Sequence, residues 1–193
     1  MLRILCAVAI MCWIIPSSAG VGAPITILFD VTKSSAWNTF GGEERREVMH
    51  ELLVADLAQF VGREVSITVV AWAEGLKEQV VGNRPVTQQL FGELDEALES
   101  VPSEGHTHTG AALGELWEQD AGGCSPIVIL TDQAPDDRAR FAEVLHEVLA
   151  SVPVHVLILP ETMHSFEAMQ TFSEFEGRSY RVAPLVPGAL ADS

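Results

Sequence analysis

Apolar runs that end in polar turns alternate along this chain with segments of helical periodicity, and this alternation constrains the fold more than any other feature. The run 127–130 contains only Ile, Val and Leu, as is typical of a strand buried on both faces of a parallel sheet. Between such runs, apolar residues recur every three or four positions, which indicates amphipathic helices. Strands that alternate with helices favour a doubly wound α/β fold, with a mostly parallel central sheet flanked by helices.

The elements are expected in the order strand, helix, two strands, two helices, and then strands and helices in turn up to a final strand. The strands are expected at 25–29, 65–72, 76–81, 127–130, 154–159 and 178–182, and the helices at 43–61, 85–101, 109–119 and 136–150, with one more after a capping Thr162. In the first helix, the spacing places Val48 and Leu52 toward the core and leaves Arg45 for the solvent side. The last helix is expected to carry Phe166, Met169 and Phe172.

The first twenty residues have the composition of an export signal. Arg3 supplies a positive start, residues 4–15 are mostly apolar, and small residues precede a cleavage site that we expect near Ala19. The apolar stretch is too short to span a bilayer. We therefore expect residues 1–19 to be a signal peptide and 20–193 to be a single domain with its core at 24–182. This domain is expected to be secreted or periplasmic, with no stable membrane span after cleavage.

The cysteines fit this expectation. Two of the three, Cys6 and Cys12, lie in the expected signal peptide, so only Cys124 remains in the mature chain. An internal disulfide is therefore not expected, and a large apolar core must supply the stability.

The charge of the chain argues against nucleic acid as a partner. Acidic residues outnumber basic ones by 27 to 11, the formal net charge is −16, and no cluster of Lys and Arg is present to follow phosphates. A field of this sign repels nucleic acid and anionic membrane surfaces, and it raises the local concentration of divalent cations.

Oxygen-bearing side chains gather at one expected edge of the sheet. They are Asp30, Thr32 and Ser34 after the first strand, Thr107 and Thr109 in the loop 105–110, and Asp132 after the strand 127–130. In a doubly wound sheet the carboxyl ends of neighbouring parallel strands line one crevice, so these side chains can converge. Carboxylate and hydroxyl oxygens suit Mg²⁺, Mn²⁺ or Ca²⁺. The first motif taken alone is equally compatible with an ordinary turn.

The three motifs together resemble the metal-ion-dependent adhesion site (MIDAS) of the von Willebrand factor A (vWA) domain family. That site has the pattern Asp-x-Ser-x-Ser, a Thr in a Gly-x-Thr-x-Thr-Gly loop, and an Asp after an apolar strand; here Thr32 replaces the first Ser. The resemblance covers residues 24–182 and implies a Rossmann-like vWA fold. It also implies that Mg²⁺ (or Mn²⁺ or Ca²⁺) is held by Asp30, Thr32, Ser34, Thr107 and Asp132. One coordination position would stay open for a carboxylate from a partner protein, so the implied role is protein capture and not catalysis.

Two features depart from the family pattern. Gln133 stands where a Gly usually follows the last Asp, which is expected to narrow the site or change the turn. The helix that often closes the family fold after the last strand is expected to be missing or very short. Neither departure removes a ligand.

Two alternatives to a cation-dependent binding domain remain. The first is a phosphatase of the haloacid-dehalogenase type with Asp30 as nucleophile and Asp136 and Asp137 as its acidic pair. The order of the motifs argues against it, because that chemistry needs its acidic pair on a separate later strand and a well-placed Lys. The second is a vWA scaffold that binds no metal.

Other residues at the expected crevice have simpler explanations. His106 and His108 form a His-x-His pair, but no third nitrogen or sulfur ligand for zinc lies nearby in the sequence. Trp37 follows Ser34 closely and is expected either to pack or to border the metal face.

Overall fold

Six strands form one sheet in the order β3-β2-β1-β4-β5-β6. The computed structural model describes residues 24–119, 125–160, 162–175, 177 and 179–190; the expected signal peptide and Cys124 lie outside these residues. The strands are β1 Ile25–Asp30, β2 Ser66–Trp72, β3 Leu76–Pro85, β4 Ile127–Thr131, β5 Val154–Ile158 and β6 Tyr180–Pro184. All neighbouring pairs are parallel except β2 and β3, which form an antiparallel hairpin.

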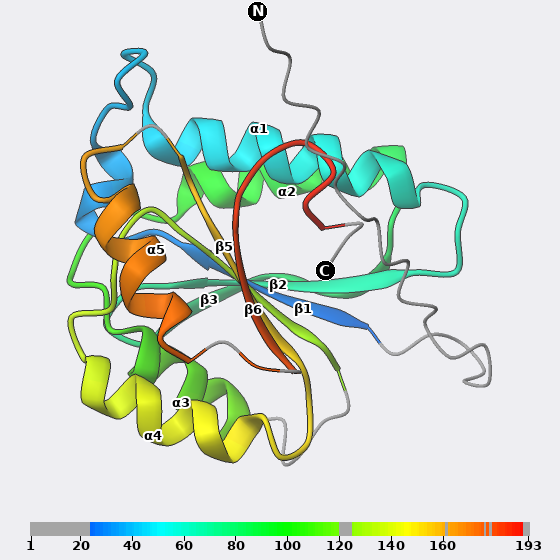
Figure 1. Ribbon diagram of the computed structural model, residues 1–193. Helices are drawn as coiled ribbons and strands as arrows, with labels where there is room; N and C mark the ends of the chain where they lie inside the picture. The colour runs from blue at the N-terminus through cyan, green and yellow to red at the C-terminus, as the bar shows by residue number, and fades with distance from the viewer. Residues whose placement is uncertain (1–23, 120–124, 161, 176, 178, 191–193) are drawn as a thin grey trace, which may run out of the picture.

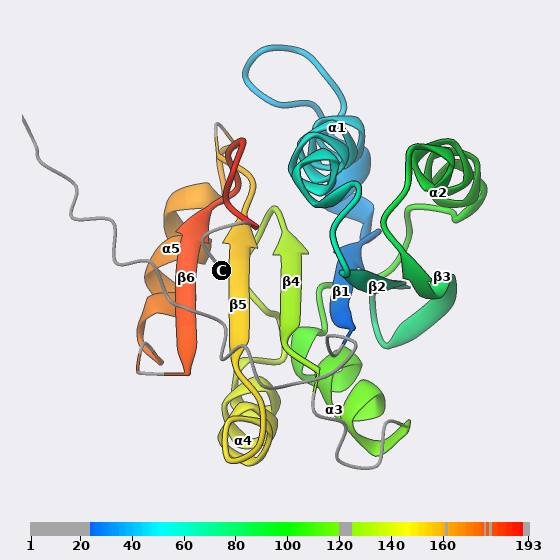
Figure 2. The ribbon, with the colours of Figure 1, turned by 90° about the vertical axis from the view of Figure 1, so that its right-hand side faces the viewer.

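Helices cover both faces of this sheet (Figures 1 and 2). One face is covered by α1 Arg45–Leu57 and α2 Gln88–Ser100, and the other by α3 Thr109–Gln119, α4 Arg138–Val148 and α5 Ser165–Ser173. Two short 3₁₀ helices, η1 Lys33–Ala36 and η2 Ala58–Phe60, follow β1 and α1. The doubly wound, mostly parallel fold and the expected order of elements are therefore confirmed.

The topology brings the ends of β1 and β4 together. These two strands are neighbours in the sheet although about a hundred residues separate them, and the order of strands reverses between them. Their carboxyl ends lie on the left of Figure 1, together with the end of β5, with η1 and with the start of α5. This is the point at which open α/β sheets place their ligand crevice.

The core has two halves, one on each side of the sheet, because successive side chains of a strand point to opposite faces. Ile27 and Phe29 of β1 pack under α1 and α2, whereas Leu28 packs against α3 and α4. On the second side, Phe141 of α4 meets Phe172 of α5 edge to face, with ring centres 5.2 Å apart.

The expected inward face of α1 was wrong by one position. Met49 and Leu53 are fully buried against the sheet, while Val48 and Leu52 are only partly buried. The latter two line a small pocket together with Leu185, because the segment after β6 runs back along the helix. The sheet and the segment after β6 both cover α1, so the apolar face of this helix is wide. The spacing of apolar residues alone does not show which of them lie at the centre of that face.

Phe166 lies on the outward side of α5, since its side chain is 81% exposed. Ala168 and Phe172 hold the inward side of α5 instead. Phe166 and Phe172 are six positions apart, which separates them by roughly 120° around a helix, so the two cannot share one face.

Residues 185–190 take the place of a closing helix. Leu185 and Leu190 are buried, and the Asp56 carboxylate of α1 accepts hydrogen bonds from the backbone N–H groups of Gly188 and Leu190, the latter at 2.8 Å. As expected, no helix follows β6 among the residues that the structure describes. Within the same residues, none of the helices has the length and apolarity needed to cross a membrane.

Candidate metal site

Asp30 lies at the end of β1 with its carboxylate fully buried. Oδ1 accepts a hydrogen bond from the backbone N–H of Thr32 at 2.8 Å, and Oδ2 accepts one from the Thr131 hydroxyl at 2.5 Å. The strand register explains the second contact, because β1 and β4 run side by side.

Three further predicted residues lie next to one another. The hydroxyls of Thr32 and Ser34 are 3.0 Å apart, and the Ser34 hydroxyl donates to Asp132 Oδ1 at 2.9 Å. All three side chains are at most 3% exposed. The turn into η1 returns the chain after β1 toward the end of β4, so Ser34 can reach a residue 98 positions away.

Thr107 is fully buried in the loop before α3, and its hydroxyl accepts a hydrogen bond from the side-chain amide of Gln133. Backbone hydrogen bonds hold this loop against the first motif: Glu104 N donates to Val31 O at 3.0 Å, and Lys33 N donates to Gly105 O at 3.3 Å. Gly105 has a φ of 83°, which favours glycine at this bend. Gln133, the residue that departs from the family pattern, thus forms a hydrogen bond with Thr107, one of the predicted ligands.

Asp136 and Asp137 hold the start of α3. Asp136 Oδ2 accepts from Thr107 N at 3.0 Å, and the two oxygens of Asp137 accept from Gly110 N and Ala111 N at 3.0 and 2.8 Å. These carboxylates cap otherwise unpaired N–H groups at the start of a helix. The hydrogen bond between Thr107 N and Asp136 holds Thr107 against the segment that follows Asp132.

Thr109, the second threonine of the loop, is the first residue of α3 and is fully buried. Its hydroxyl has no hydrogen-bond partner in the part of the chain that the structure describes.

Arg45 is buried beside the predicted ligands, so its expected solvent position was wrong. Its side chain is 3% exposed, and Nη1 lies 2.5 Å from Asp132 Oδ2. Nε donates to the backbone oxygen of Asn38 at 3.3 Å, and the guanidinium lies 5.4 Å from the centre of the Trp37 ring. Helical periodicity cannot indicate that Arg45 pairs with Asp132, 87 residues away in the sequence. The sequence signal for a buried basic residue is the pair of acids, Asp30 and Asp132, whose negative charge needs a positive partner once both are buried.

The pKa of Asp30 is raised from 3.8 to about 7, first by burial and then by the nearby charge of Asp132. The hydrogen bonds from Thr131 and Thr32 oppose this rise. The site therefore holds more negative charge than its surroundings stabilise, and one positive side chain, Arg45, contacts it directly.

The predicted residues suit a hard divalent cation. Their donors are oxygens only, two from carboxylates and three from hydroxyls, and the raised pKa of Asp30 shows that additional positive charge would be favourable there. No group of three or more His, Cys, Asp and Glu side chains capable of holding a metal is found in the described ranges, so hydroxyls must complete any such site. His106 and His108 stack on each other with ring centres 5.9 Å apart, and His106 is largely exposed.

Large apolar side chains are exposed close to this edge of the sheet. Trp37 is 44% exposed and its ring lies 5.7 Å from that of His164, the residue before α5. Met163 and Phe166, on either side of His164 in the sequence, are also exposed, as is Phe40 in the loop before α1. We call Trp37, Phe40, Met163 and Phe166 the apolar rim.

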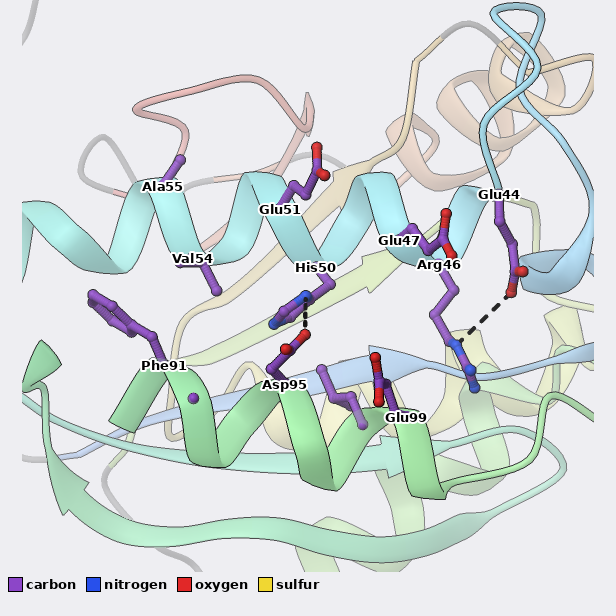
Figure 3. A pocket seen from close by; sticks show the side chains of 12 residues that line it. Glu44, Arg46, Glu47, His50, Glu51, Val54, Ala55, Phe91, Asp95 and Glu99 are labelled. Atoms are coloured by element: carbon purple, nitrogen blue, oxygen red, sulfur yellow. Dashed lines mark ion pairs between the residues drawn. The ribbon is translucent and has the colours of Figure 1, made fainter. Parts of the chain in front are cut away.

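A groove of about 650 Å³ lies elsewhere, between α1 and α2 (Figure 3). Five of its twelve lining residues are acidic, and His50 of α1 reaches Asp95 of α2 with 3.4 Å between Nδ1 and Oδ1. None of the predicted ligands lines it, so its size alone does not make it the functional site.

No protein-family model matches the sequence, and no curated protein matches it either. Solved structures do. The PilB minor pilin from Streptococcus sanguinis matches with a TM-score of 0.64 and 14% identity, over 88% of this chain and 58% of the pilin chain. The SpRpn10 VWA domain matches with a TM-score of 0.62 and 14% identity, over 88% of this chain and 92% of that domain.

The manganese-loaded TRAP protein of Plasmodium vivax is also similar, with a TM-score of 0.59 and 14% identity, over 86% of this chain and 69% of TRAP. The chain thus spans little more than half the length of the pilin, and most of the vWA domain. At these identities the likeness shows a shared fold, and nothing more.

Proposed function

We propose that this chain, which has the vWA fold, is an exported interaction domain that binds a divalent cation and captures a partner protein through an acidic side chain. Asp30, Thr32, Ser34, Thr107 and Asp132 hold the cation, which is Mg²⁺, Mn²⁺ or Ca²⁺. The partner's carboxylate fills the remaining coordination position. The domain is secreted or periplasmic after cleavage near Ala19.

One observation carries this proposal. Ser34 contacts both Thr32 and Asp132 at hydrogen-bonding distance, beside the buried Asp30, although the two strand ends come from distant parts of the sequence. Five oxygens suit a six-coordinate ion with one position left for a ligand. A protein with the same fold, TRAP, is manganese-loaded, which supports the choice of a divalent cation.

The apolar rim supports a protein as the ligand. Four large apolar side chains exposed near a group of charged residues are typical of a protein interface, in which apolar contacts surround a polar centre. A partner that places a carboxylate on the ion would cover the rim at the same time.

The phosphatase alternative has less support. Asp136 and Asp137, the acidic pair of that alternative, are engaged by backbone N–H groups at the start of α3.

A metal-independent interaction domain is the second candidate, and the Arg45–Asp132 contact favours it. A buried guanidinium that already neutralises Asp132 makes a cation less necessary for stability. In this case the apolar rim alone would carry the partner contact.

Adjacent serines provide the test. Ser34 contacts two predicted ligands, whereas Ser35 is equally buried but donates to the backbone oxygen of Thr32 at 2.7 Å. In calorimetric titration with MnCl₂, Ser34→Ala is expected to weaken binding by at least about tenfold, and Ser35→Ala to change it much less. Absence of binding to the wild-type domain at millimolar Mn²⁺, Mg²⁺ and Ca²⁺ would overturn the cation-dependent function and leave the second candidate.

Capture of a partner is tested with the same variants. Immobilised wild-type domain, without residues 1–19, is expected to retain a protein from its own cell envelope in Mg²⁺ and to release it in EDTA. Ser34→Ala should retain little in either buffer, and Ser35→Ala should behave like wild type. Retention that EDTA does not change favours the metal-independent domain.

A further inference from the structure

The position of Arg45 has no part in the proposed function. This arginine is the first residue of α1, yet its charged end lies within the candidate metal site and not in solvent. Asp132 Oδ1 accepts a hydrogen bond from the Ser34 hydroxyl, and Asp132 Oδ2 accepts one from the Arg45 guanidinium. Both oxygens of a predicted ligand are therefore occupied by groups of this chain.

A guanidinium and a divalent cation are not compatible at the same carboxylate without rearrangement. Two positive groups close together repel strongly where water is excluded, and Asp132 and Arg45 are 0% and 3% exposed. An ion at Asp132 must therefore share the carboxylate with Arg45 at a cost or displace it. Arg45 can leave Asp132 because its side chain is long and flexible, although its backbone is held at the start of α1.

The guanidinium has a second contact that remains available at the surface. It lies over the ring of Trp37, which is 44% exposed, so the side chain can move outward along the indole. The Trp37 ring in turn neighbours His164 at 5.7 Å, next to Met163. A movement of Arg45 would therefore change the apolar rim as well as the metal site.

We infer that Arg45 is the built-in counter-ion of the cation-free site, and that a divalent cation binds by displacing Arg45 from Asp132. The inference rests on the proposed function, because the cation is the one proposed to bind at Asp30 and Asp132. Arg45 then sets how tightly the cation is held. It also links occupancy of the site to the shape of the apolar rim, so that a partner meets a different surface before and after the ion binds.

The test compares Arg45→Gln with Arg46→Gln, which removes the same charge one residue further along α1. Arg46 points to Glu44 and to the backbone oxygen of Val101, away from the predicted ligands. In calorimetric titration with MnCl₂, Arg45→Gln is expected to bind at least about tenfold more tightly than wild type, and Arg46→Gln to stay within about threefold.

The outcomes separate this inference from the proposed function. If only Arg45→Gln binds, competition is supported, while cation binding by the natural chain is wrong. If the wild type binds and a folded Arg45→Gln binds equally or more weakly, competition is overturned and the proposed function stands. If neither binds, both are overturned.

Loss of a buried ion-pair partner can prevent folding, so a measurement on the unaltered arginine is needed as well. Titration of wild type with MgCl₂ is expected to shift tryptophan emission over the same concentration range as the heat of binding. Trp37→Phe, which keeps Trp72 and Trp117, is expected to lose this shift and to keep the heat. Binding of Mg²⁺ that leaves the emission of Trp37 unchanged would overturn the displacement of Arg45.

Discussion

Asp30 ends β1, Asp132 follows the neighbouring β4, and the charge of Asp132 helps to raise the pKa of Asp30 to about 7 while both carboxylates are fully buried. The folded protein therefore binds a proton at Asp30 more tightly than the unfolded chain, in which the pKa is 3.8. Between these two values the folded state carries the proton and the unfolded state does not.

This difference predicts how stability depends on pH. Without divalent cations, the free energy of unfolding is expected to fall by on the order of 3 kcal/mol as the pH rises from 4 to 7. Urea unfolding in EDTA measures it. Asp30→Asn should remove most of the fall. His50 and His155 have pKa values lowered mainly by burial and contribute with the opposite sign, so the difference between wild type and variant isolates Asp30. An identical pH profile in both proteins would contradict the prediction.

Gln133 is expected to weaken cation binding, because its amide donates to the hydroxyl of Thr107. Replacement by Ala frees this hydroxyl for the ion. A hydrogen bond contributes about 1 kcal/mol net, so Gln133→Ala should bind Mn²⁺ about fivefold more tightly in calorimetric titration. Gln89→Ala, on the exposed surface of α2, serves as the control and should leave the affinity unchanged. Weaker binding by Gln133→Ala would show that the amide supports the site.

Gly110 is expected to tolerate no side chain. A Cβ at this position of α3 would lie 2.3 Å from the backbone nitrogen of Phe141 in α4. Gly110→Ala must push the two helices apart and should lower the free energy of unfolding by about 3 kcal/mol. The matched control is Gly92→Ala in α2, where nothing lies within 4 Å of the new methyl group; it should stabilise the helix by up to about 1 kcal/mol. Thermal unfolding of both variants checks the contrast, and equal melting temperatures would refute it.

The two phenylalanines of α5 should differ in what they contribute. Phe172 is fully buried against Phe141, so Phe172→Ala is expected to cost about 3 to 5 kcal/mol of stability. Phe166 is 81% exposed, and Phe166→Ser should change stability by less than about 0.5 kcal/mol. Under the proposed function, Phe166→Ser should nevertheless reduce capture of a partner. Unfolding curves measure the first contrast, and retention on immobilised domain measures the second.

The sequence was sufficient to predict the fold and the grouping of four predicted ligands. The apolar runs identify the strands, and the topology then brings Asp30, Thr32, Ser34 and Asp132 to one edge. The contacts of Arg45 were not predictable in the same way. Periodicity describes how a helix faces its immediate surroundings, and the partner of Arg45 comes from another strand. Whether these residues hold a cation remains a prediction.

The contact of Gln133 with Thr107 was not predicted. The departure from the family pattern led to the expectation of a narrower site or a changed turn, which stays a prediction. The amide contact itself depends on how the loop 105–110 is held against the segment after β4. That arrangement is set by Asp136, whose backbone N–H donates to Thr107 O and whose carboxylate accepts from Thr107 N. Such reciprocal contacts between loops have no local sequence signal.

The hydrogen bond between Ser34 and Asp132 joins residues 98 positions apart. The contact closes when β4 pairs with β1, and the connection between these two strands contains β2, β3, α1, α2 and α3. Contacts this distant in sequence slow the folding of a domain. A chain whose synthesis or folding has stopped before β4 lacks Asp132, so a partner that depends on the complete site meets only finished domains.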